Sequence, residues 1–222
     1  MPERLVFADA AGAADVLVFA QRAVGLGDGV VRLKARGGVL LVSCAPLAPR
    51  TLLDATPTIL GMRVARVDPE LECDLTVAAG GLAAGGAGEL VLPATAVTAT
   101  WAGISPPQSG WSGDGSVRAA AVAAVAQRGI ATVAERLPAD PGDDVVHAVR
   151  AAVWGAPADE LGGLPAGAAF AAFALGFIRG DDDARVRAHG AWTRLSLPRG
   201  HVLVRERTAG GLTPVRATGR VG

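Results

Sequence analysis

Histidine, cysteine and serine are the side chains in this sequence that could do covalent or metal chemistry, and their spacing matches no motif for either. No pair among His147, His189 and His201 has the i, i+4 spacing that brings two imidazoles to one face of a helix. Cys44 and Cys73 are too far apart for a C-x-x-C motif, and we expect both to be buried free thiols. We therefore expect no metal and no cofactor.

Enzymatic activity of an unrecognised type is the least favoured of three hypotheses. The stretch GWSGD from Gly110 contains the serine of a nucleophile elbow, but it ends in aspartate where the motif G-x-S-x-G requires glycine. Catalysis would instead need Ser109 or Ser112 within hydrogen-bonding distance of His147 or His201. We favour a non-enzymatic protein.

The segment TWAGISPPQSGW, residues 100–111, places two of the four tryptophans of the chain on a stretch rich in Pro and Gly. One interpretation is structural: both indoles anchor a crossover between a strand-rich and a helix-rich half, and the Pro-Pro pair stiffens it. The other is functional, because an indole offers apolar area and one N–H donor, as the walls of small-molecule sites often do. The ligand-binding residues would then be Trp101, Ser105, Gln108, Trp111 and Arg118.

The formal net charge of zero hides an asymmetry along the chain. Residues 184–222 carry eight arginines and a single acidic residue, Glu206, whereas residues 1–183 carry more acidic than basic residues. The arginines would either pair with the acidic remainder, within the chain or across a dimer, or bind the phosphates of a nucleic acid. We favour pairing, because Trp192 is the one aromatic residue in this segment that could stack on bases. The nucleic-acid alternative would use Arg185, Arg187, Arg194, Arg199, Arg205 and Arg207.

The hydrophobic pattern predicts an α+β fold, with helix-plus-β-hairpin units at both ends of a helical middle. Residues 9–24 have the period of an amphipathic helix. Residues 29–46 read as a hairpin that turns at Gly37 and Gly38, and on its first strand Arg32, Lys34 and Arg36 alternate with apolar residues. Helices are predicted at 116–137, 143–154 and 165–177, and strands follow to residue 207. Because strands and helices do not alternate regularly, a doubly wound parallel sheet is disfavoured.

This pattern divides the chain into three parts, which could together form one continuous domain. They are an N-terminal α/β unit (1–96), a Trp- and Pro-rich crossover loop (97–116), and a helical segment followed by a C-terminal hairpin unit (117–222). An internal duplication would explain why the two ends look alike. A shift of 155 residues aligns 11–42 with 166–197, and nine of the 32 positions are identical. Chance is the alternative, because Ala and Gly are so common here.

Location and partners are predicted from what the sequence lacks. The N-terminus carries acidic residues inside its first apolar stretch, unlike a signal peptide. The longest apolar run, Ala168–Ile178, is shorter than the roughly 20 residues of a membrane span. We expect a cytoplasmic protein with no membrane partner, which forms a homodimer through Ala/Gly-rich or hairpin surfaces.

Three stretches, VTATWAGISPPQSGW, PAGAAFAAFALGF and WTRLSLPRGHVLVR, together resemble an uncharacterised family of conserved actinobacterial proteins. The resemblance covers most of the chain from about Val97 onward and, more loosely, the N-terminal hairpin. It implies no catalytic residue, because the family has no assigned activity. The favoured hypothesis is a non-enzymatic binding or interaction protein with its site at the Trp101–Trp111 loop and a small molecule as its ligand. A nucleic-acid-associated protein and an enzyme of unrecognised type remain the alternatives.

Overall fold

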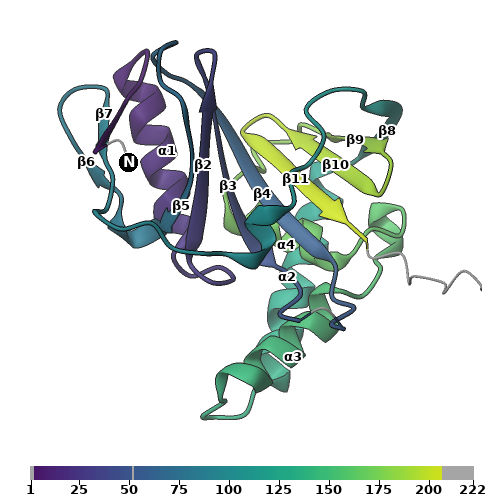
Figure 1. Ribbon diagram of the computed structural model, residues 1–222. Coiled ribbons are helices and arrows are strands. Elements are labelled where there is room, and N and C mark those ends of the chain that lie inside the picture. The colour runs from purple at the N-terminus through teal and green to yellow at the C-terminus, as the bar shows by residue number, and fades with distance from the viewer. Residues whose placement is uncertain (1–2, 52, 207–222) are drawn as a thin grey trace, which may run out of the picture.

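The computed structural model describes residues 3–51 and 53–206, and its main feature is an eight-stranded antiparallel sheet (Figure 1). The strand order is β5-β2-β3-β4-β11-β10-β9-β8, and a smaller sheet of order β1-β7-β6 lies beside it. The elements in chain order are β1 (Arg4–Val6), α1 (Ala10–Ala23), β2 (Val30–Arg36), β3 (Val39–Leu47), β4 (Thr58–Arg66), β5 (Cys73–Ala78), η1 (Ala79–Gly81), β6 (Ala83–Ala84), β7 (Glu89–Val91), η2 (Thr100–Gly103), β8 (Ser112–Val117), α2 (Ala119–Arg136), α3 (Asp143–Trp154), η3 (Asp159–Leu161), α4 (Ala166–Ala174), β9 (Ala184–His189), β10 (Trp192–Leu197) and β11 (Gly200–Arg205).

The two halves of the chain share the large sheet. The predicted hairpin of β2 and β3 forms, and both glycines of its turn have positive φ. Strand β4 of the N-terminal half pairs antiparallel with β11 of the C-terminal half. Helices and an antiparallel sheet in separate runs of sequence make this an α+β fold, as predicted.

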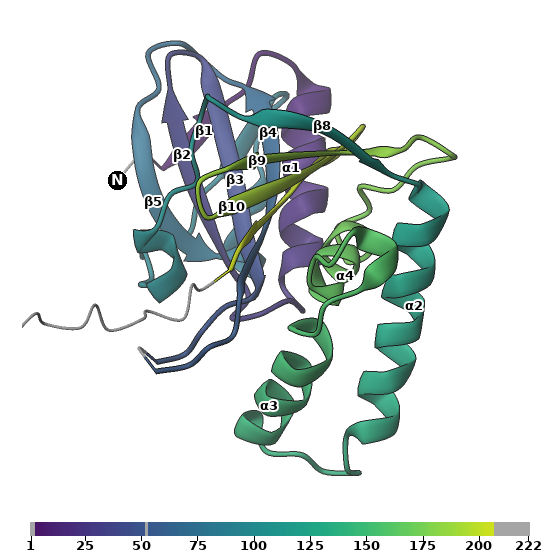
Figure 2. The same cartoon turned by 90° about the vertical axis from the view of Figure 1, so that its right-hand side faces the viewer.

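Helices α1 and α4 cover one face of the sheet, while α2 and α3 extend beyond it (Figure 2). The inward residues of the strands and the apolar faces of the helices form one continuous core, in which the rings of Phe19 and Phe177 stack at 6.1 Å. Gly61 lets α4 approach β4, because a Cβ atom there would collide with the side chain of Leu175.

Both ends of the chain repeat the same order of elements. An N-terminal helix, hairpin and third strand (α1, β2, β3, β4) correspond to α4, β9, β10 and β11. In each unit the hairpin strands are neighbours and the third strand pairs with the second. The third strands then pair with each other at the middle of the sheet. The shared topology is what an internal duplication requires.

Two element boundaries differ from the sequence predictions. The crossover loop predicted at 97–116 ends early, because Ser112 begins strand β8, an edge strand paired with β9. The helix predicted at 165–177 is shorter in the structure, because α4 ends at Ala174.

Two further predictions concern the cysteines and the membrane. Cys44 and Cys73 are both free; Cys44 is buried and Cys73 is half-buried. Burial raises the pKa of both thiols. Within the part of the chain that the structure describes, no helix has the length and apolar character needed to cross a membrane.

Candidate functional site

The face of the sheet opposite α1 and α4, called the outer face below, carries a row of polar side chains. Because side chains alternate along a strand, cross-strand partners on this face form continuous rows. One row crosses all eight strands and consists of Thr76, Arg32, Ser43, Met62, His201, Ser196, Arg185 and Ser116. The neighbouring rows contribute Lys34, Arg36, Arg187 and Arg194 to the same face. The outer face is therefore strongly basic.

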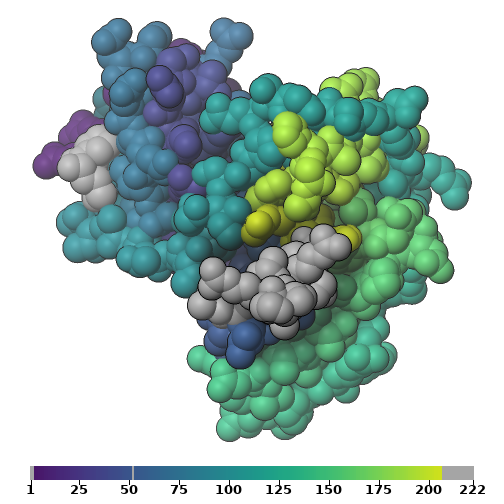
Figure 3. All heavy atoms as spheres, turned by 45° about the vertical axis from the view of Figure 1, so that its right-hand side comes forward, coloured from purple at the N-terminus to yellow at the C-terminus, as the bar shows by residue number. Residues whose placement is uncertain are grey.

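Residues 97–111, called the Trp loop below, cross this face from the N-terminal to the C-terminal strands (Figure 3). Trp101 is 5% exposed, and its Nε1–H donates to Asp28 at 2.8 Å. Arg32 holds the same part of the loop from below, donating from Nη1 to Ala102 O at 2.7 Å and to the Ser105 hydroxyl at 2.9 Å. Trp101 therefore has the structural role that one interpretation of this segment predicted: it anchors the Trp loop to the sheet.

A groove of about 460 Å³ lies between the Trp loop and the outer face; we call it the Trp groove. Its floor is mainly apolar and includes Leu41, Leu60, Met62, Val64 and Leu203. Its wall is formed by the loop residues Ser105, Pro106, Pro107, Gln108 and Trp111. Its basic side chains are Arg32, Lys34, Arg36, Arg194 and His201, and no acidic residue lines it among the described residues.

Trp111 and Arg194 form one end of the Trp groove. The guanidinium carbon of Arg194 lies 4.6 Å from the centre of the Trp111 ring, a cation–π geometry. The Trp111 Nε1–H donates to Pro107 O at 3.1 Å, which holds the ring against its own loop. The Nε of Arg194 is buried and has no acceptor among the described residues. A buried donor without an acceptor is costly, so this end of the groove favours a ligand that supplies one.

His201 lies beside Arg194 on the next row of the outer face. Its Nδ1 and the Ser196 hydroxyl are 3.1 Å apart. Burial lowers the pKa of His201, and the positive charge of Arg194 lowers it further. Burial likewise lowers the pKa of Arg194, together with the charge of Arg187, although a guanidinium stays protonated in proteins. A negatively charged ligand would relieve the repulsion among these groups.

The structure brings three of the five predicted ligand-binding residues together. Ser105, Gln108 and Trp111 line the Trp groove. Trp101 does not; it borders a smaller hollow of about 250 Å³ on the other side of the loop. Arg118 lies outside the groove, because β8 carries the chain to the far edge of the sheet before α2 begins there. Trp101 and Arg118 therefore lie apart from the other three residues of the predicted set.

The predicted nucleic-acid residues do not all share one face either. Arg185, Arg187, Arg194 and Arg205 lie on the outer face through their strand register. Arg199 sits in the turn after β10 and lies 3.7 Å from Asp15 of α1, so it belongs to the opposite face. The last member of the set, Arg207, lies outside the described residues.

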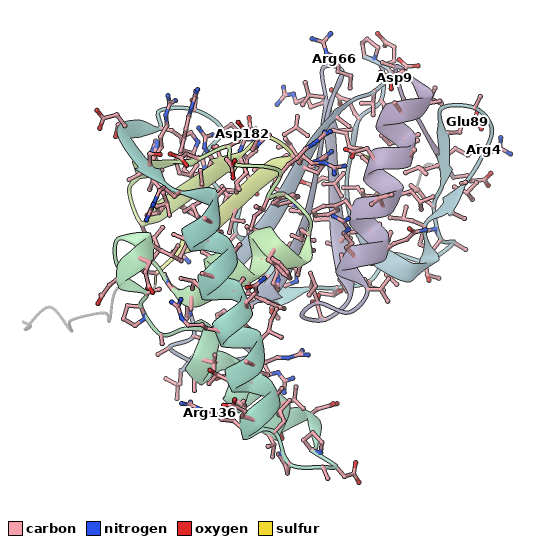
Figure 4. The ribbon with its side chains drawn as sticks, turned by 180° about the vertical axis from the view of Figure 1, so that it is seen from behind. Arg4, Asp9, Arg66, Glu89, Arg136 and Asp182 are labelled. Atoms are coloured by element: carbon pink, nitrogen blue, oxygen red, sulfur yellow. The ribbon has the colours of Figure 1, made fainter. Side chains whose placement is uncertain are left out.

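The favoured explanation for the C-terminal charge, pairing with acidic residues, holds only in part. Arg199 is paired with Asp15. For Arg185, Arg187, Arg194 and Arg205 the structure shows no acidic partner within residues 3–51 and 53–206. Pairs that do form lie elsewhere, such as Arg4 with Glu89 at 3.1 Å on the small sheet (Figure 4). The positive charge of the outer face is therefore not neutralised by these pairs.

The serine–histidine pairs that catalysis would need are not formed as predicted. Ser112 donates to Ala188 O at 3.3 Å, and His147 contacts Asp54. The one serine recorded near His201 is Ser196, which sequence reasoning did not single out. No carboxylate is recorded at the second ring nitrogen of His201 in the described chain, whereas a catalytic histidine is usually oriented by a third group.

Asp54 ties the loop between β3 and β4 to α3. Its carboxylate accepts hydrogen bonds from the backbone N–H groups of Arg50 and Thr56, both at 2.9 Å, and from the Thr56 hydroxyl. His147 Nε2 lies 3.3 Å from the same carboxylate. Burial alone would raise the pKa of Asp54, but these hydrogen bonds outweigh it and hold the pKa well below its usual range.

Sequence reasoning missed most of the residues that line the Trp groove. Lys34, Arg36 and His201 line it, as do the apolar residues of β3 and β4. The alternation of Arg32, Lys34 and Arg36 was a usable signal, since it places three cations on one face of the sheet. This alternation does not reveal that the Trp loop crosses the same face. The path of the loop depends on contacts between residues that are far apart in the chain.

Two family models match the chain, and the matches meet within the Trp loop. Residues 1–103 match a domain of unknown function (DUF8010), and residues 106–209 match a second domain of unknown function (DUF8185). The resemblance to an uncharacterised family is thereby confirmed, and neither model assigns an activity; the actinobacterial range stays a prediction. No curated protein matches the sequence.

Solved structures that share the fold include DNA polymerase sliding clamps. The clamp from Caulobacter crescentus has a TM-score of 0.50 and 14% identity, with 99% of this chain and 69% of that chain covered. A putative DNA polymerase III beta subunit from Eubacterium rectale has a TM-score of 0.50 and 7% identity, with 92% and 64% covered. The chain thus spans about two thirds of the length of these proteins. At such identities the likeness shows a common fold and nothing more.

Proposed function

We propose that the protein is a non-enzymatic binding protein, and that the Trp groove takes an anionic ligand with an apolar part. The observation that carries the proposal is the lining of the groove, with five basic side chains over an apolar floor. Its volume of about 460 Å³ lies within the range of small-molecule sites. The unsatisfied Nε of Arg194, stacked on Trp111, supplies a point where an acidic group is stabilised.

Anilinonaphthalene sulfonate, which joins an anionic head to an aromatic body, is a suitable first probe. Its fluorescence is titrated with the wild-type protein, with Arg194→Gln and with Arg185→Gln. The control variant removes a charge from the same face but outside the groove, since Arg185 lines a separate hollow at the β8–β9 edge. We expect Arg194→Gln to weaken binding about tenfold or more, and Arg185→Gln to leave it nearly unchanged. Equal loss in both variants would contradict a groove site.

Nucleic-acid binding is the second candidate. Two observations favour it: Arg185, Arg187 and Arg194 lie together on the outer face without acidic partners in the described chain, and the proteins that share the fold are named for DNA polymerase. The test is the fluorescence anisotropy of labelled duplex DNA at rising salt. Each of Arg185→Gln and Arg187→Gln should then reduce the salt slope by about one. No change in anisotropy at low salt would rule this candidate out.

We also propose a cytoplasmic homodimer, as the sequence predicted. The exposed apolar side chains of Val18 on α1 and of Val24 directly after it support an association surface there. Sedimentation equilibrium measures the mass directly, and a monomer at every concentration would contradict the dimer.

A further inference from the structure

The five basic side chains of the Trp groove are not equally available to a ligand. Arg32 donates from Nε and Nη2 to the two carboxylate oxygens of Asp74, at 2.7 and 2.8 Å, and from Nη1 to the Trp loop. Lys34 Nζ lies 3.7 Å from the same carboxylate. Arg36 and Arg194 have no acidic partner within the described chain. The unpaired positive charge of the groove therefore belongs to these two arginines.

Arg36 and Arg194 lie at opposite ends of the groove. Strands β3, β4 and β11 separate β2 from β10, which corresponds to about 19 Å across the sheet. Through the strand register Arg36 lies in the row of Arg66, and Arg194 in the row of Leu60, six residues away on β4. That offset corresponds to about 20 Å along the strands. One carboxylate or phosphate group cannot reach both arginines.

On β3 and β4 the middle of the groove is mainly apolar. Leu41, Met62 and Val64 form the floor there, and Pro106 and Pro107 form the wall. Val64 is 47% exposed, so its side chain is accessible from the groove. This part of the groove gains from contact with an apolar surface.

A peptide or a nucleic acid fits this middle poorly. The floor strands β3, β4 and β11 are each paired on both sides, so they offer no free edge to an added strand. The backbone groups of a peptide would then lie on apolar side chains without partners, and the phosphates of a nucleic acid would meet the same surface. An unbranched hydrocarbon segment has no such cost.

We propose that the Trp groove binds a long-chain dianion, a molecule with an acidic group at each end and an apolar chain between them. This rests on the groove being a ligand site, as proposed above. One acidic group pairs with Arg194 and supplies the acceptor that its buried Nε lacks. The chain lies over Leu41, Met62 and Val64, and the second acidic group pairs with Arg36.

Isothermal titration calorimetry tests the dianion proposal by comparing dicarboxylates with monocarboxylates of the same length. The dicarboxylates are octane-, dodecane- and hexadecane-dioate, and the monocarboxylates are octanoate, dodecanoate and hexadecanoate. All are used below their aggregation limits. We expect hexadecanedioate to bind about tenfold or more tightly than hexadecanoate. Arg36→Gln should remove that advantage while leaving the binding of the monocarboxylate unchanged. Arg194→Gln should weaken both ligands. Arg66→Gln is the matched control, since Arg66 lies in the row of Arg36 but does not line the groove.

Circular dichroism of each variant shows whether it is folded. We expect all three variants to fold, because Arg36, Arg66 and Arg194 form no ion pair within the described chain. Equal affinity for hexadecanedioate and hexadecanoate, with no effect of Arg36→Gln, overturns the dianion and leaves the anionic site intact. Failure of every carboxylate and of anilinonaphthalene sulfonate to bind overturns the site itself.

Discussion

At the scale of single residues, two features of the Trp groove favour an anion: neighbouring basic side chains, and a buried hydrogen-bond donor that has no acceptor. Burial and the charge of Arg194 lower the pKa of His201, and the Nε of Arg194 has no acceptor in the described chain. Trp111 covers the guanidinium at 4.6 Å and shields it from water on one side. A negatively charged ligand relieves the repulsion and satisfies the donor together, and this is why we place the ligand's acidic group here.

Anion binding in the groove should depend on pH through His201. Its pKa is lowered in the free protein and rises when a carboxylate lies nearby, so binding takes up a proton. Affinity should therefore increase as the pH falls through the pKa of the complex and level off below the pKa of the free protein. Calorimetry between neutral and mildly acid pH measures this. His201→Gln should flatten the profile, whereas His147→Gln, on α3 and outside the groove, should not. A flat wild-type profile would refute the linkage.

Asp54 should contribute stability that is lost in acid. Because its folded pKa is held below the unfolded value, the carboxylate stabilises the fold above about pH 4, and the contribution disappears as the pH falls through the folded pKa. We expect Asp54→Asn to lower the free energy of unfolding by about 1–3 kcal/mol at neutral pH. Urea denaturation at several pH values measures it, and Asp140→Asn, an exposed acid, serves as the control. An unchanged midpoint for Asp54→Asn would contradict the account.

At the scale of elements, the Trp loop depends on one side chain of the strand beneath it. Arg32→Gln removes the hydrogen bonds to Ala102 O and Ser105 and weakens the pair with Asp74. The amide of Ile104, bonded to Trp101 O, should then exchange with solvent about tenfold faster. Hydrogen exchange read by NMR measures this. Arg36→Gln, on the same face of the same strand, should leave the exchange rate unchanged. Equal exchange rates in wild type and Arg32→Gln would show that the Trp loop does not depend on the hydrogen bonds from Arg32.

Elements with local causes could be predicted from the sequence, and those with distant causes could not. The hairpin of β2 and β3 follows from alternation and from two glycines at positive φ, and α1 follows from its period. The pairing of β4 with β11 joins residues more than a hundred positions apart, and nothing in either strand specifies its partner. The same distinction holds for the site. Trp111 and Arg194 could each be predicted as binding residues from the sequence, but their stacking on each other depends on the long-range pairing of strands.

At the scale of the whole molecule, the two similar units should depend on each other. If the other unit were missing, each unit would leave the edge of β4 or β11 open and would expose the part of the shared core that packs against the other unit. We therefore expect fragments 1–103 and 106–222 to lack cooperative thermal unfolding when alone and to regain it when mixed. Differential scanning calorimetry measures this, with the full chain as the reference. A two-state transition in either isolated fragment would show that the units fold independently.

The central claim is that an anionic ligand enters the Trp groove, and the indole N–H signals of the four tryptophans test it most directly. In ¹⁵N-correlated NMR spectra, assigned with Trp→Phe variants, hexadecanedioate or anilinonaphthalene sulfonate is titrated into the protein. Trp111 lines the groove, whereas Trp154 is buried among the helices. The account predicts that the Trp111 signal moves in a saturable way while that of Trp154 stays in place. A saturable shift of Trp154 with Trp111 unmoved, or no shift with either ligand, would contradict it.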